Sequence, residues 1–201
     1  MSLLEMLQQR LGGDVVNRIS SRIGADPGTT GNAIDAALPL LISALAGNAQ
    51  NGDQARALAT AVSQDHDGSI LDDVAGHVSH PDEQTGAGIL RHVLGGRQQT
   101  VESGLSQATG LEPEKVGALL TTLAPLVLGA LGRAKQQAGV DGQAGVDGRD
   151  VSVLLNQEQQ HLNQSAPGAM SALSRLLDRN NDGSVVDDIG GMLGKAFGSG
   201  R

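Results

Sequence analysis

The sequence of 201 residues predicts an all-α protein, a bundle of helices joined by Gly-rich and Asp-Gly-Ser turns. Apolar residues recur at spacings of three and four, for example at Val116, Leu119, Leu120 and Leu123, which places them on one face of a helix. No segment alternates apolar and polar residues as a half-buried strand does, and Phe197 is the single aromatic residue. These observations together favour helices throughout the chain.

The helices are expected to form two related halves, residues 1–86 and 87–201. Each half contains, in order, a short helix, a Gly-Gly pair, a second helix, a long helix, an Asp-Gly-Ser turn and a final helix. The match is closest between residues 63–74 and 178–189, which share the letters D-G-S and a following pair of aspartates. The two halves are either separate domains or parts of one core.

Prolines mark both the start and the middle of each long helix. An acidic residue followed by a proline, at positions 26–27 and 112–113, places a capping side chain and then a residue that needs no N–H partner at the helix start. Pro39 and Pro125 lie further along. They are expected to kink or split their helices, because proline removes one backbone hydrogen bond and crowds the preceding turn.

The second half carries an insertion between its long helix and its Asp-Gly-Ser turn. Residues 138–149 contain a Gly-rich hexapeptide and a near copy of it, in which little can pack, so we expect a mobile segment there. The remainder predicts an added helix over residues 150–162, with Asp150 as its N-cap. Its apolar face is expected at Val153, Leu154 and Leu155.

The composition excludes several classes of function. Hydrophobic residues make up 39% of the chain, enough to bury a core. Because there is no Cys, disulfides and thiolate metal sites are excluded, and because there is no Trp or Tyr, the chain lacks aromatic platforms on which bases stack. The net charge of −8 argues against a nucleic-acid partner, since binding phosphates requires clustered Lys and Arg.

The sequence also predicts where the protein resides. Its first ten residues lack the basic region and the apolar stretch of a signal peptide. The longest apolar runs, residues 36–46 and 123–131, are shorter than the roughly 20 residues that span a bilayer. We therefore expect a cytoplasmic protein with no membrane insertion.

The second Asp-Gly-Ser loop is the sharpest chemical feature. Oxygen-bearing side chains alternate along it and a glycine follows, a pattern that lets a loop curl around Ca²⁺. The candidate ligands of this loop are Asp178, Asn180, Asp182, Ser184 and Asp187. The loop departs from an EF-hand at position twelve, where Ile189 replaces the bidentate glutamate. In the first loop, Asp65, Asp67 and Asp72 are weaker candidates for the same ion.

Helix capping is the alternative explanation of both loops. Ser69 with Asp72, and Ser184 with Asp187, have the spacing of a capping box, in which the serine caps the helix and the acid reaches back. Acidic residues in a first turn also suit the helix dipole. Capping accounts for the glycine, the serine and the downstream acids without a metal, but it does not account for the strict alternation at the start of the second loop.

The sequence contains no recognisable catalytic constellation. Neither the G-x-S-x-G elbow of hydrolases nor a phosphate-binding G-x-x-x-x-G-K-[ST] loop occurs. His77 and His80 have a spacing at which they could share a transition metal with His66 or His92, but no third ligand has a fixed spacing, and solvated surface histidines are the favoured explanation. We therefore expect that the protein is not an enzyme.

Several segments resemble a known bacterial family. They read A-L-P-L-L at 37–41, D-H-D-G-S-I-L-D-D-V at 65–74, G-I-L-R-H-V-L-G-G at 88–96, L-A-P-L-V-L-G-A-L-G at 123–132 and D-G-S-V-V-D-D-I at 182–189. Together they are similar to the DUF937 family, which includes YidB-like proteins, from about Ala33 to Phe197. The resemblance implies an all-helical bacterial protein and, for the YidB-like branch, an element similar to a homeodomain. It implies no activity and no catalytic residue.

These observations predict a non-catalytic helical binding or scaffold protein. It is expected to associate with a protein partner or with a second copy of itself, and to bind Ca²⁺ through its Asp-rich loops. Abundant Gly and Ala allow such self-association, although tight packing within one bundle explains them at least as well. The alternative, which rests on the homeodomain-like resemblance, is a DNA-associated regulator of helix-turn-helix type, and the acidic balance argues against it.

Overall fold

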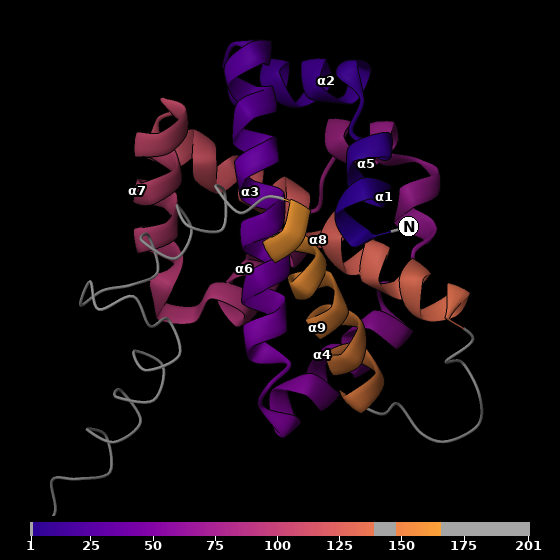
Figure 1. Ribbon diagram of the computed structural model, residues 1–201. Helices are drawn as coiled ribbons and strands as arrows, with labels where there is room; N and C mark the ends of the chain where they lie inside the picture. Colours follow the sequence, from indigo (N-terminus) through magenta and orange to yellow (C-terminus); the bar gives the residue numbers. More distant parts are fainter. Residues whose placement is uncertain (1, 139–147, 166–201) are drawn as a thin grey trace, which may run out of the picture.

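The computed structural model describes residues 2–138 and 148–165, and these residues form helices and turns without a strand (Figure 1). The prediction of an all-α fold is confirmed. The α-helices are α1 (Leu3–Arg10), α2 (Gly13–Ile23), α3 (Pro27–Asn48), α4 (Gly52–Gln64), α5 (Val74–Ser79), α6 (Glu83–Leu94), α7 (Gln98–Thr109), α8 (Pro113–Gln137) and α9 (Gly148–Ser165). Two short 3₁₀ helices are η1 (Ser69–Asp72) and η2 (Gly95–Arg97).

The two long helices α3 and α8 form the centre of the molecule and pack against each other. Both begin where predicted, with an acidic N-cap and a proline at the first helical position. Pro39 and Pro125 were expected to kink or split their helices; both helices are continuous, so neither is split, and the kink stays a prediction. Both helices are buried along most of their length, so packing against the surrounding elements stabilises each of them as a helix.

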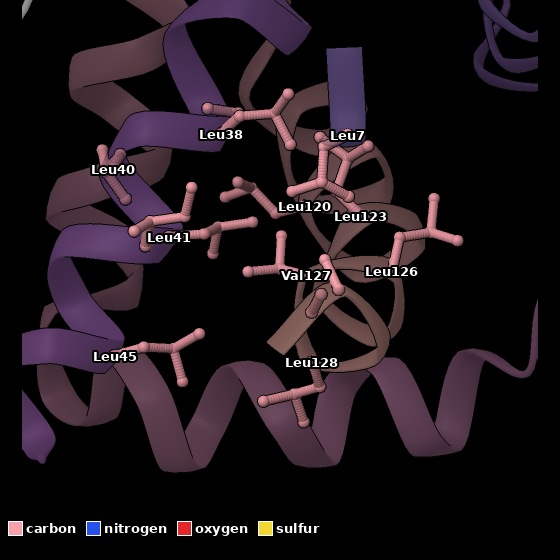
Figure 2. Packing of buried hydrophobic residues seen from close by; sticks show 14 of the residues in the cluster. Leu7, Leu38, Leu40, Leu41, Leu45, Leu120, Leu123, Leu126, Val127 and Leu128 are labelled. Atoms are coloured by element: carbon pink, nitrogen blue, oxygen red, sulfur yellow. The ribbon is translucent and has the colours of Figure 1, made fainter. Parts of the chain in front are cut away.

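One aliphatic core joins the two halves of the sequence. Leu7 of α1 and Leu38 of α3 lie beside Leu120 and Leu123 of α8, and all four side chains are fully buried (Figure 2). The face predicted for the helix after Pro113 is therefore confirmed. Residues before and after position 86 belong to a single cluster of buried side chains.

The order of elements recurs along the chain. A short helix, a second helix and a long helix appear as α1, α2 and α3, and again as α6, α7 and α8. The second helix of each set ends at a glycine in the left-handed conformation, Gly24 with φ of 65° and Gly110 with φ of 79°. Glycine suits this C-cap because it has no Cβ to clash with the following carbonyl.

Helix α9 lies along α3 and α4 (Figure 1), and the prediction of its apolar face is confirmed for Leu155 and Leu154, which face the core, and is wrong for Val153. Asp150 lies in its first turn and is not the N-cap, since the helix begins at Gly148. Val153 is 54% exposed, while the buried apolar residues are Val151, Leu155 and Leu162. Three consecutive residues cannot all face a core from a helix, and the side chains that do are spaced by four and seven.

The same face of α9 carries a buried carboxylate. Glu158 is 6% exposed, and its two oxygens accept hydrogen bonds from the backbone N–H groups of Leu3 and Leu4, at 2.9 and 3.0 Å. These N–H groups belong to the first turn of α1, where a helix has no carbonyl partners of its own. A carboxylate there is also favoured by the helix dipole. Glu158 thus links the start of α1 to a helix more than 150 residues away.

Glycine permits one helix, α6, and the loop after α4 to approach α8 closely. A Cβ on Gly86 of α6 would lie 2.2 Å from the carbonyl oxygen of Thr121, and one on Gly132 of α8 would lie 2.1 Å from that of His66. Neither position has room for a larger residue unless the backbones separate. These small residues therefore serve packing within the bundle.

Helices α3 and α8 are also long and apolar enough to cross a membrane, by length and composition alone. Most of each apolar window is buried inside the fold, and the core helix of a soluble protein passes the same test. The helices are longer than the apolar runs noted in the sequence, because each run forms only part of its helix. The cytoplasmic location stays a prediction.

Candidate functional site

The first Asp-Gly-Ser loop connects α4 to α5 and is shaped by its own residues. Gly68 has φ of 99°, a left-handed conformation that favours glycine, and a Cβ there would lie 3.0 Å from backbone atoms of α8. The Asp67 carboxylate accepts a hydrogen bond of 2.9 Å from the Ser69 N–H, which closes a tight turn. This bond is the main reason that the pKa of Asp67 lies below its ordinary value.

Side chains near the end of α8 hold this loop in place. The Arg133 guanidinium donates to the Gly68 carbonyl and to the Asp72 carboxylate, each at 2.8 Å. Gln136 donates to the Asp67 carbonyl at 2.8 Å. The loop is therefore fixed by protein donors, and its backbone lies directly against Gly132 of α8.

These contacts determine the roles of the predicted calcium ligands in the first loop. Asp72 pairs with Arg133, Asp67 accepts from the backbone, and Asp65 lines a cavity described below. Among the described residues, no group of three or more His, Asp or Glu side chains has the arrangement of a metal site. Protein groups therefore hold the first loop as a turn, and calcium binding by Asp65, Asp67 and Asp72 stays a prediction.

The predicted capping box differs from the structure. Ser69 does not cap a helix with its side chain, and it begins the 3₁₀ helix η1 after Gly68. Asp73 is the N-cap of α5, with its carboxylate accepting from the Gly76 N–H at 2.8 Å. The candidates of the second loop, Asp178, Asn180, Asp182, Ser184 and Asp187, lie outside the described residues. Calcium binding there stays a prediction.

A cavity of about 170 Å³ lies where the loop meets α5, α6 and α8, and we call it the polar cavity. Its lining consists mainly of acidic, imidazole and hydroxyl side chains, with two apolar residues. The lining residues are Asp65, His66, Asp67, Gly68, Ser69, Ile70, His77, Asp82, Thr85 and Pro125. The consecutive residues Asp65, His66 and Asp67 are thereby brought together with His77 and Asp82.

His66 is half-buried in this cavity, and its imidazole makes no hydrogen bond within the described part of the chain, although its backbone N–H donates to the Ala61 carbonyl at 3.1 Å. Burial lowers the pKa of its imidazole, and the neighbouring carboxylates of Asp65 and Asp67 act in the opposite direction. Since the pKa lies below the ordinary value, the ring is neutral at pH 7. A neutral imidazole has one nitrogen that donates and one that accepts, and both are available here.

His77 is the second histidine that lines the polar cavity. Its Nε2 lies 3.2 Å from the Thr122 carbonyl oxygen. A carbonyl only accepts, so Nε2 carries the proton and Nδ1 of the neutral ring is the acceptor. Burial is the main cause that lowers the pKa of His77, with the positive charge of Arg22 adding to it, while the Thr122 carbonyl and Asp82 raise it.

Asp82 supplies negative charge to the cavity from the start of α6. Its carboxylate accepts from the backbone N–H groups of Gln84 and Thr85, both at 3.0 Å, and from the Thr85 hydroxyl at 2.7 Å. The bond from the Thr85 N–H is the largest reason that the pKa of Asp82 is lowered. The carboxylate is ionised at pH 7, and protein donors already occupy its oxygens.

The hydroxyl groups of the cavity do not form a nucleophile–base pair. Thr85 donates its hydroxyl to Asp82, and Ser69 bonds to the Asp67 carboxylate. Activation of a hydroxyl by an imidazole requires a hydrogen bond between the two, and no such bond occurs among the described residues. The arrangement is suited to binding a ligand.

Comparison with known proteins gives the family. The sequence model of a family described as bacterial proteins of unknown function, DUF937, matches residues 5–134. The chain belongs to the DUF937 family. The match begins earlier and ends earlier than the resemblance noted from the motifs, so it contains α1 to α7, most of α8 and the whole polar cavity. In this DUF937 protein, α9 and the second Asp-Gly-Ser loop lie beyond the matched segment. No curated protein and no solved structure matches the chain significantly.

Proposed function

We propose that this DUF937 protein is a non-catalytic helical protein that acts by binding a small ligand in the polar cavity. The observation that carries the proposal is the pair of half-buried imidazoles, His66 and His77, that face one cavity with ring nitrogens left without a protein partner. Polar atoms removed from bulk water are almost always hydrogen-bonded, so we expect water or a ligand to form hydrogen bonds with these ring nitrogens.

The size of the cavity restricts the ligand. Typical pockets for drug-sized molecules enclose roughly 300–1,000 Å³, and the polar cavity is smaller, at about 170 Å³. The ligand is therefore a small molecule or ion and not a peptide or a nucleotide. The whole cavity lies within the residues that the family model matches, which places the site in the part of the chain shared with the family.

Titration of the full chain with a panel of small cations, neutral amides and carboxylates tests this function. We expect one chemical class to shift the imidazole NMR signals of His66 and His77 with saturation, while the signals of the exposed His80 and His92 stay in place. His66→Leu should weaken this binding without unfolding the protein. If no member of the panel causes a saturable shift of either cavity imidazole, the proposed function is wrong.

The calcium prediction for the second loop is tested separately. Addition of excess Ca²⁺ to chelator-treated protein is expected to release or absorb heat and to raise the melting temperature, because a ligand that binds only the folded state stabilises it. Replacing Asp178 and Asp182 by Asn should abolish both effects, whereas Asp65→Asn should not. Absence of heat and of any thermal shift in the unmodified chain would leave the loop as a helix cap.

The proposal also includes association with a protein partner or with a second copy of the chain. Self-association and a protein partner remain expectations, and light scattering of the purified chain tests the first of them. The net charge of −8 argues against DNA as the partner. Duplex binding that weakens steeply with salt would reverse this judgement.

A further inference from the structure

The polar cavity combines negative charge with neutral nitrogen acceptors. Three carboxylates line it, those of Asp65, Asp67 and Asp82, and no Lys or Arg is among the described residues that do. Charges gathered in a partly enclosed cleft reinforce one another and raise the local concentration of counter-ions. The field in the cavity therefore favours a cation over a neutral or anionic ligand.

The carboxylates differ from the imidazoles in what they can still bind. Asp82 accepts three hydrogen bonds from its own turn, and Asp67 accepts the Ser69 N–H. These two groups contribute charge, but protein donors already bind them, whereas the Asp65 carboxylate accepts no hydrogen bond among the described residues and can still bind a donor. The free acceptor that is best defined is the Nδ1 of His77, together with one ring nitrogen of His66.

This division argues against a metal ion and for a hydrogen-bond donor. A transition metal would require several side chains directed at one point, and no such group of three occurs in the part of the chain that the structure describes. An ammonium group carries the required positive charge and has three N–H donors that can reach separate acceptors. Ile70 and Pro125 supply an apolar wall for a short carbon chain.

We propose that the polar cavity binds a small organic ammonium ion, whose N–H groups donate to the rings of His66 and His77 within the field of the three aspartates. This inference rests on the proposed function, because it names the class of ligand for the same site.

Protons are expected to compete with such a ligand. Both imidazoles have a pKa below the ordinary value, so both rings are neutral acceptors near pH 7 and become cations as the pH falls. A protonated ring has no acceptor and repels an ammonium ion. The charged groups that act on these two rings are Asp65, Asp67, Asp82 and Arg22, and Arg133 acts on Asp67. Ammonium binding is therefore strongest at or above neutral pH and is lost on acidification.

Ethylammonium chloride is the probe for this inference, with acetamide and acetate as neutral and anionic probes of similar size. In the full chain at about pH 7.5, ethylammonium is expected to shift the signals of both cavity imidazoles with saturation, and the other two probes are not. Its affinity should fall at least fivefold as the pH is lowered through the range in which the NMR signals show the two imidazoles to titrate, roughly the effect of losing one charged hydrogen bond or more.

Paired variants separate the site from the rest of the surface. His66→Leu removes an acceptor from the cavity and is expected to weaken ethylammonium binding about tenfold. His92→Leu alters an exposed histidine of α6 that does not line the cavity, so it should leave the affinity unchanged. Circular dichroism of both variants establishes that they fold, and the pH dependence of the unmodified chain needs no variant.

The outcomes distinguish this inference from the proposed function. Saturable shifts by acetate or acetamide in place of ethylammonium would overturn the ammonium assignment and leave small-ligand binding intact. If Zn²⁺ shifts the signals of both imidazoles with saturation and with higher affinity than ethylammonium, the ammonium assignment is wrong and a metal is favoured. Failure of every probe, with the wider panel included, would overturn both.

Discussion

Replacing Glu158 by alanine is expected to lower the free energy of unfolding by about 2–4 kcal/mol. The side chain is buried and its two oxygens accept from the N–H groups of Leu3 and Leu4. Alanine leaves these donors without an acceptor at the start of α1, and each hydrogen bond to a charged group contributes about 1.5–3 kcal/mol. Chemical denaturation, followed by circular dichroism, measures the change.

Two further variants of α9 make this result specific. Glu158→Gln keeps the shape of the side chain but has only one acceptor oxygen. Its free energy of unfolding should therefore lie between that of the wild type and that of the alanine variant. Gln157→Ala changes an exposed neighbour on the same helix and should alter stability by no more than about 0.5 kcal/mol. If Glu158→Ala were as mild as Gln157→Ala, the carboxylate would not hold α1 to α9.

Substitution of two glycines in α6 is expected to give opposite signs. A Cβ on Gly86 would lie 2.2 Å from the Thr121 carbonyl oxygen, so alanine must push α6 away from α8. Overpacking of this kind costs about 1–3 kcal/mol, more than the roughly 0.5–1 kcal/mol that alanine contributes to a helix interior. Gly86→Ala is therefore expected to destabilise the protein.

Gly88→Ala is the matched control two residues further along the same helix. No atom lies within 4 Å of the Cβ it would add, so only the helix-forming advantage of alanine remains. We expect a gain of about 0.5–1 kcal/mol in the free energy of unfolding. Equal effects of the two substitutions, of either sign, would contradict the close approach of α6 to α8.

The fold could be predicted from the sequence where local signals are strong. The acidic residue and proline at the start of each long helix, and the spacing of Val116, Leu119 and Leu120, identify α3 and α8 because caps and periodicity act within a few residues. The orientation of α9 could not be predicted in this way. Its buried face depends on α3 and α4, and it includes Glu158, a polar residue that no hydrophobic pattern would place in a core.

The candidate site was only partly accessible from the sequence. The Asp-Gly-Ser motif correctly predicted a turn. Its acids also suggested a metal site, because the sequence does not show that Asp72 pairs with Arg133, which lies 61 residues away. The histidine spacing suggested that His77 and His80 share a site with His66 or His92, and the structure places His77 and His66 in the lining of one cavity. The sequence signal for this site was a histidine between two aspartates at 65–67, and such a signal does not predict which distant residues lie beside it.

A crystal structure of the full chain grown at about pH 7.5 with ethylammonium chloride tests the central claim most directly. The account predicts density for the ion in the polar cavity, with its nitrogen at about 2.7–3.2 Å from a ring nitrogen of His66 or His77. An empty cavity at a saturating concentration of the ion, with the His66 ring bonded to a protein group, would contradict the account.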